Sequence, residues 1–111
     1  MGYIRNHAII VSDYDDKRIE RAQAAAAVCF AKYNLEGLVS NVVRHVVNGG
    51  AAFFISPDGS KEGWESSNNG NKAREEFISW LRSPSAGYME WALLVLGGDD
   101  SEYRVEQSPN D

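Results

Sequence analysis

The sequence is poor in cysteine, in basic residues and in long apolar runs. Its single cysteine, Cys29, excludes an internal disulfide and any metal cluster built from several cysteines. Lysine and arginine number 11 against 16 aspartates and glutamates, and the net charge is −5. This balance argues against a general nucleic-acid clamp and against binding to an anionic membrane surface. The longest apolar run, residues 24–31, is far too short to span a bilayer.

The chain has 111 residues, of which 43% are hydrophobic and 24% charged. This composition is typical of a globular protein, and the length fits one domain with one core. We predict a single α+β domain over residues 1–106 and a flexible C-terminal tail over 107–111, because the last residues are polar and include Pro109. The first residues contain one arginine and no apolar stretch of signal-peptide length, which favours a cytoplasmic protein.

A first helix is predicted over residues 15–33. Apolar side chains recur there at spacings of three and four, so that one continuous face is apolar. Aspartates at the start of this segment favour a helix N-terminus. Asn34 or Gly37 provides the left-handed residue that commonly ends a helix.

A second helix is predicted over residues 72–82, capped by Asn69 or Asn71. The preceding residues 57–71 combine turn residues, glycines, mixed charges and Trp64. Two interpretations of this segment stay open. It is either a functional loop on a rigid scaffold, or a turn followed by a short strand over 61–65 whose tryptophan covers a gap in the core.

Five β-rich segments predict strands. The first ends in a continuous apolar run and is expected to be a central strand buried on both faces. The second and third flank Asn48–Gly49, the residue pair that most favours a tight hairpin turn. The last alternates charged and apolar residues, as an exposed edge strand does. The expected strands cover residues 3–11, 38–47, 51–56, 88–96 and 103–106.

The predicted order is therefore β-α-β-β-α-β with an additional C-terminal strand. This is the split βαβ, or ferredoxin-like, pattern of the α+β class. It predicts an antiparallel sheet with both helices on one face. The other face is then open to water or to a partner.

His7 and His45 are the two histidines. Neither lies in a His-x-Thr/Ser triplet, and neither spacing demands a metal, so we predict no catalytic residue, no metal and no cofactor. One enzymatic alternative is kept, a hydrolase-like activity in which His7 acts as general base beside Asp13 or Asp99. Cys29 is expected to be a small core residue, because it lies on the apolar helix face.

A small-ligand site is the second alternative. An arginine such as Arg5 would pair with a phosphate, and Trp64 would stack on a nucleotide base. Aromatic residues on the open sheet face would instead suit a protein interface. The candidate binding residues are Arg5, His7, Asp58, Lys61, Trp64 and Trp91.

The opening residues 1–11 and the block 56–64 resemble small hypothetical proteins of tailed bacteriophages and prophages. The resemblance covers most of the chain and carries no assigned activity. It implies a small accessory protein in the cytoplasm of a bacterial host, where such proteins bind a host protein or sequester a small molecule. We therefore expect a non-enzymatic protein that binds a host protein or forms a homodimer, with no direct nucleic-acid or membrane partner.

Overall fold

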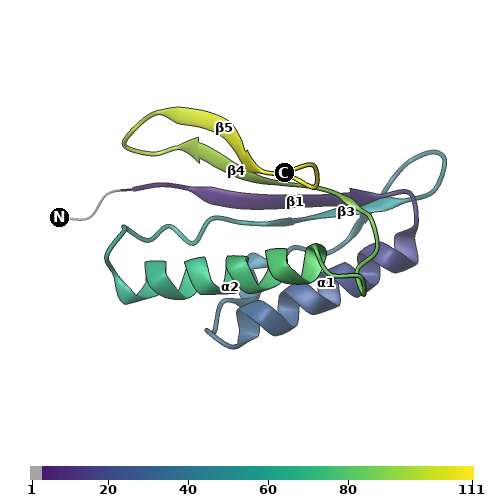
Figure 1. The fold of residues 1–111 in the computed structure, drawn as a ribbon, viewed down its shortest axis with the longest axis horizontal. Helices are drawn as coiled ribbons and strands as arrows, with labels where there is room; N and C mark the ends of the chain where they lie inside the picture. The colour runs from purple at the N-terminus through teal and green to yellow at the C-terminus, as the bar shows by residue number, and fades with distance from the viewer. Residues whose placement is uncertain (1–3) are drawn as a thin grey trace.

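Residues 4–111 are described by a computed structural model, in which five antiparallel strands form one sheet and two α-helices pack against it (Figure 1). Tyr3, the predicted start of the first strand, falls outside the described residues. The elements are β1 (His7–Asp13), α1 (Asp16–Ala31), the 3₁₀ turn η1 (Glu36–Leu38), β2 (Val43–Arg44), β3 (Ala51–Ile55), α2 (Glu65–Leu81), β4 (Glu90–Gly97) and β5 (Glu102–Gln107).

The sheet has the strand order β2-β3-β1-β4-β5, and every adjacent pair is antiparallel. The predicted α+β class is confirmed. Figure 1 shows α1 and α2 together on one side of the sheet, which leaves the opposite face without a helix. The complete order is not that of a four-stranded split βαβ sheet, because β5 adds an edge beside β4. That edge extends to Gln107, which pairs with Leu93.

The one-sided helix layer overturns the prediction that β1 is buried on both faces. Ile9 and Val11 are fully buried beneath the helices, whereas Ile10 is 45% exposed on the other face. Strand β4 was likewise expected to be a continuous buried run, but buried and less buried residues alternate along it. Leu94 is only half-buried and Leu96 is exposed. Local hydrophobicity predicts a strand, but the position of the helices decides which face is covered.

Helix α1 begins and ends close to its predicted limits. The Asp15 side chain caps the helix by accepting hydrogen bonds from the backbone N–H groups of Lys17 and Arg18. Shortly after the helix, Asn34 adopts a φ of 59°, the left-handed conformation expected at that position. Alanines on the inner face allow the helix to approach the sheet closely.

The strand predicted over residues 38–47 is much longer than the one observed. Only Val43 and Arg44 form β2, and the segment begins with η1. Ser40 explains the interruption, because its backbone N–H donates to the carbonyl of Phe54 while its hydroxyl accepts from the Phe54 N–H. A side-chain oxygen thus replaces a backbone carbonyl in the ladder. The Asn48–Gly49 turn is present, with φ values of 63° and 66°.

Helix α2 begins at Glu65, seven residues before its predicted start, so neither Asn69 nor Asn71 is a cap. The short strand predicted over 61–65 is reduced to a single bridge between Lys61 and Ile4. The first half of the helix is hard to predict from the sequence, because it is rich in serine, asparagine and glycine, whose intrinsic helix propensity is low. Its buried side is nevertheless a regular stripe: Ser67, Gly70, Ala73, Arg74, Phe77, Ile78 and Leu81.

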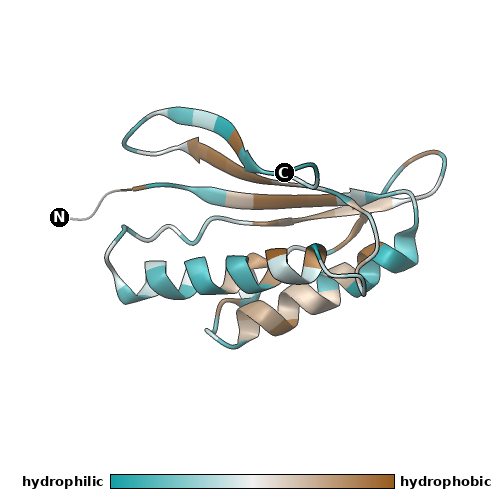
Figure 2. Cartoon of the chain, viewed as in Figure 1, coloured by the Kyte–Doolittle hydropathy of each residue, from teal (hydrophilic) through white to brown (hydrophobic). Residues whose placement is uncertain are grey.

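The core lies between the sheet and the two helices. Phe30 of α1 and Phe77 of α2 are its largest fully buried side chains. Figure 2 shows apolar residues along the central strands and on α1, whereas β5 and much of α2 are hydrophilic. Trp64 covers no gap in this core, because it is 52% exposed at the N-terminus of α2. Trp80 is half-buried and stacks on Phe77.

Candidate functional site

The helix-free face of the sheet carries a continuous apolar surface, which we call the open face. Strand register places Ile10 between Phe54 on β3 and Ala92 on β4. Two residues further along these strands, on the same face, Leu94 lies between Ala8 and Val105. Side chains directly opposite each other on adjacent strands are in contact distance, so these rows form one surface. The open face comprises Ala8, Ile10, Ser12, Val43, Ala52, Phe54, Glu90, Ala92, Leu94, Leu96, Tyr103 and Val105.

Charge is scarce on the open face. Two ionisable side chains lie at one end of it: Glu90, which accepts a hydrogen bond from Tyr88 at 3.1 Å, and His45, whose Nε2 lies 3.5 Å from the Ser12 hydroxyl. Large apolar side chains are exposed there, with Phe54 at 38% and Val105 at 57%. A face that is largely apolar, carries few charges and has no helix above it is the kind of surface that protein partners bury.

The predicted binding residues divide among four places. Arg5, Lys61 and Trp64 lie at one end of the molecule, where the Ile4–Lys61 bridge joins their segments. Arg5 is 3.8 Å from Glu62 and 3.5 Å from Asp100, and the Lys61 ammonium lies 5.9 Å from the centre of the Trp64 ring. The structure thus brings these three together.

Asp58 has a buried position below α2. Its Oδ1 accepts hydrogen bonds from the backbone and hydroxyl of Ser60, and its Oδ2 lies 3.5 Å from Nη1 of Arg74. Burial lowers the pKa of the Arg74 guanidinium, and the neighbouring Asp58 carboxylate opposes that shift. The geometry gives Asp58 a role in holding the loop to the helix.

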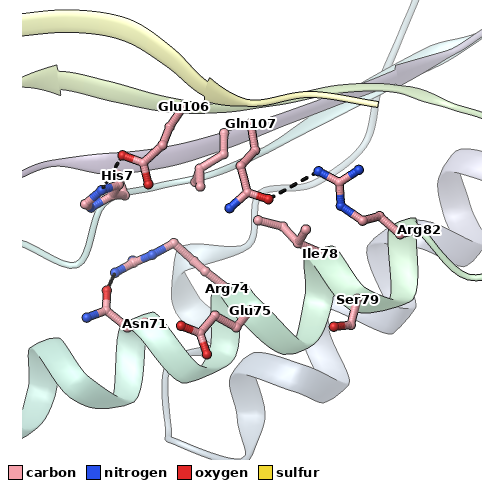
Figure 3. Close-up of a pocket in the computed structure, with 10 residues that line it drawn as sticks. His7, Asn71, Arg74, Glu75, Ile78, Ser79, Arg82, Glu106 and Gln107 are labelled. Carbon is pink, nitrogen blue, oxygen red and sulfur yellow. Dashed lines mark hydrogen bonds and ion pairs between the residues drawn. The ribbon is translucent and has the colours of Figure 1, made fainter. Parts of the chain in front are cut away.

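His7 lines a cavity of about 330 Å³ between α2 and β5, which we call the groove (Figure 3). Its Nε2 lies 3.5 Å from Glu106 on β5. Neither acid proposed as a partner in catalysis is close. Asp13 ends the same strand about 20 Å away by strand rise and pairs with Arg18, and Asp99 accepts from the Ile4 N–H. The partner of His7 is therefore one that the sequence reasoning missed.

Arg82 borders the groove at the C-terminal end of α2. Its Nη2 donates to Gln107 at 3.2 Å, as Figure 3 shows, and to the carbonyl of Ser108 at 3.3 Å. Its guanidinium also lies 4.9 Å from the centre of the Trp91 ring. Trp91 is buried on the helix side of the sheet, where it pairs with Val11 of β1. Sequence reasoning missed Arg82 because its partners come from a strand 25 residues later in the chain.

Two further side chains with reactive groups, His45 and Cys29, lie outside the groove lining. His45 Nε2 lies 3.5 Å from the Ser12 hydroxyl, and its Nδ1 lies 3.1 Å from the carbonyl of Gly49. Burial raises the pKa of the Cys29 thiol, which disfavours the reactive thiolate. Within residues 4–111, no group of three or more histidine, cysteine, aspartate or glutamate side chains is placed to hold a metal ion.

Comparison of the chain with protein-family models, with curated proteins and with solved structures finds no match. No helix in the described part of the chain is both long and apolar enough to cross a bilayer.

Proposed function

We propose that this protein acts by association rather than catalysis, and that the open face forms a homodimer. The observation that supports this is the apolar row across the sheet, in which Phe54, Ile10 and Ala92 are direct cross-strand neighbours with no helix above them. The scaffold is an α+β fold with both helices on one side of a five-stranded antiparallel sheet, which leaves this face free for a partner. The resemblance to phage proteins suggests a host protein as the other kind of partner.

Charge distribution favours a second copy as the occupant. The chain has a net charge of −5, so two copies repel each other over most of their surfaces. Glu90 is the one acidic side chain that the described strands place on the open face, and there two acidic copies meet with least repulsion. A two-fold axis sets the same patch against itself, so a largely apolar face is self-complementary with little further matching.

The size of the open face indicates how tightly two copies should associate. Five strands about 4.8 Å apart and roughly six residues at about 3.3 Å each give a face of about 24 by 20 Å. This is about 480 Å² in projection, smaller than the ~800 Å² per partner of a standard interface. We therefore expect a reversible dimer that dissociates on dilution.

Sedimentation velocity of the whole chain from about 1 μM to about 1 mM tests this proposal, with a shift from monomer to dimer expected. Ile10→Lys and Phe54→Glu each bring like charges together at the centre of the interface, and each should keep the chain monomeric across this range. Val46→Lys is the matched control, because Val46 is 99% exposed and lies in the hairpin loop.

Circular dichroism of each variant separates a lost interface from a lost fold. A wild-type chain that stays monomeric at the highest concentration would contradict self-association and leave a host protein as the partner to seek. Folded Ile10→Lys and Phe54→Glu variants that dimerise like the wild type would place the interface elsewhere.

A further inference from the structure

Ser12 and His45 meet at one end of the open face, although strand β3 lies between the segments that carry them. Ser12 of β1 pairs with Ala52 of β3, and Ala52 pairs in turn with Val43 of β2. His45 directly follows β2, the strand at the edge of the sheet. Its Nε2 nevertheless lies 3.5 Å from the Ser12 Oγ. The imidazole therefore reaches across the width of β3 to make this contact.

Gly50 makes room for the imidazole of His45. The backbone N–H of His45 donates to the carbonyl of Gly50 at 3.0 Å, so the two residues face each other at the base of the hairpin. A β-carbon on Gly50 would lie only 2.8 Å from Nδ1 of His45, closer than a β-carbon can approach another heavy atom. The bare backbone at Gly50 thus leaves open the path along which the ring reaches Ser12.

The second ring nitrogen of His45 determines which form of the imidazole faces the serine. Nδ1 lies 3.1 Å from the carbonyl oxygen of Gly49, which can only accept a hydrogen bond. The proton of the neutral ring is therefore on Nδ1, and Nε2 presents its lone pair to the Ser12 hydroxyl. A hydroxyl, an imidazole that accepts from it and a third group that orients the imidazole are the arrangement of an activated nucleophile.

Two cavities adjoin at Ser12. One, of about 260 Å³, is lined by the apolar side chains of Ile10 and Ala92, and the other, of about 410 Å³, is lined by His45. Ser12 and Glu90 line both cavities, so an acyl chain in the apolar cavity can place its carbonyl carbon at the serine. Glu90 is also the direct cross-strand neighbour of Ser12, and its negative charge disfavours anionic acyl donors.

We propose that Ser12 is an acyl acceptor and that His45 activates it toward an uncharged, short-chain ester. Nε2 of His45 takes the proton of the Ser12 hydroxyl as Oγ bonds to the carbonyl carbon of the ester. The bond from that carbon to the leaving oxygen then breaks, and the leaving oxygen takes the proton from the imidazolium. The products are an O-acyl serine and a free alcohol. This covalent modification of the open face goes beyond the proposed association and does not depend on the dimer.

Reaction of the whole chain with p-nitrophenyl butyrate tests this proposal at about 1 μM protein, where the proposed dimer is dissociated. Peptide mass mapping should find a butyryl group on Ser12. Ser12→Ala should abolish this label, and His45→Gln should slow its formation by about 100-fold, the lower end of general-base contributions. Ser66→Ala and His7→Gln are the matched controls and should be labelled at Ser12 like the wild type. Ser66 is exposed on α2, and His7 lies in the groove on the helix side.

The pattern of labelling decides whether Ser12 is an activated nucleophile. Circular dichroism confirms that the His45→Gln variant is folded, which its exposed position on the hairpin favours. Labelling of Ser12 no faster than that of Ser66, or a rate that folded His45→Gln leaves unchanged, would overturn the proposal. Butyrylation confined to lysine side chains would overturn it as well. None of these results alters the sedimentation of the unmodified chain, so failure here is distinguishable from failure of the dimer.

Discussion

Nη1 of Arg74 lies 3.5 Å from Oδ2 of Asp58, and both side chains are more than nine-tenths buried, with 8% and 9% of their surfaces exposed. These two atoms make no hydrogen bond to another described residue, so the pair is an electrostatic contact. It joins the loop after β3 to the middle of α2. The loop between β3 and α2 is therefore held to the helix by a buried ion pair.

Removing one partner of this pair should be costly. Asp58→Asn preserves an acceptor for Ser60 but leaves the Arg74 charge buried without compensation, and we expect a loss of about 3–5 kcal/mol in the free energy of unfolding. Arg74→Met/Asp58→Asn should lose less than the sum of the two single variants. Urea unfolding of the four proteins measures this difference, and additive losses would show that the two groups do not interact.

Gly70 makes room for the buried pair. A β-carbon at this position would collide with Oδ2 of Asp58 and lie 3.3 Å from Nη1 of Arg74. Glycine to alanine inside a helix normally stabilises by about 1 kcal/mol, but Gly70→Ala should destabilise instead. Gly37→Ala is the control, since a β-carbon there meets nothing within 4 Å. Equal thermal midpoint shifts in the two variants would contradict this account.

Leu93 and Leu94 are neighbours in β4 on opposite faces of the sheet. Leu93 is 5% exposed in the core, so Leu93→Ala should lower the free energy of unfolding by about 2–5 kcal/mol. Leu94→Ala should cost clearly less in the monomer but weaken the proposed dimer. Unfolding measured at low protein concentration, together with sedimentation at high concentration, separates the two effects. A greater loss of monomer stability in Leu94→Ala would reverse our assignment of the faces.

Acid should weaken the contact between the two helices. The Glu76 carboxylate accepts hydrogen bonds from Lys32 at 3.0 Å and from the Tyr33 hydroxyl at 2.9 Å, and these lower its pKa below the ordinary value of 4.5. A carboxyl whose pKa is lowered by folding stabilises the fold above its unfolded pKa, and this contribution is lost as the pH falls through the folded pKa.

The free energy of unfolding of the wild type should therefore fall more steeply below about pH 4.5 than that of Glu76→Gln. Urea titrations at a series of pH values compare the slopes, with Glu36→Gln as a control that leaves the helix contact intact. Parallel curves for the wild type and Glu76→Gln would rule out this contribution.

Features that depend on residues near each other in the chain could be predicted from the sequence. The spacing of apolar residues, the Asp15 cap and the left-handed Asn34 place α1 within two residues of its observed ends. The Asn48–Gly49 turn and the edge strand β5 likewise follow from residues that are close together in the chain. Helix α2 was predicted too short, because its first half is stabilised by packing of Ser67 and Gly70 rather than by propensity.

The candidate sites depend on distant residues, and only the tertiary structure brings these together. The sequence by itself determined the α+β class, the helix over residues 16–31 and the turn at 48–49, since each follows from contacts within one segment. Which face of the sheet stays bare, where Asp58 meets Arg74 and how α2 and β5 enclose a groove were decided by packing. Burial on a strand depends on which side the helices occupy, and no local pattern in that strand records it.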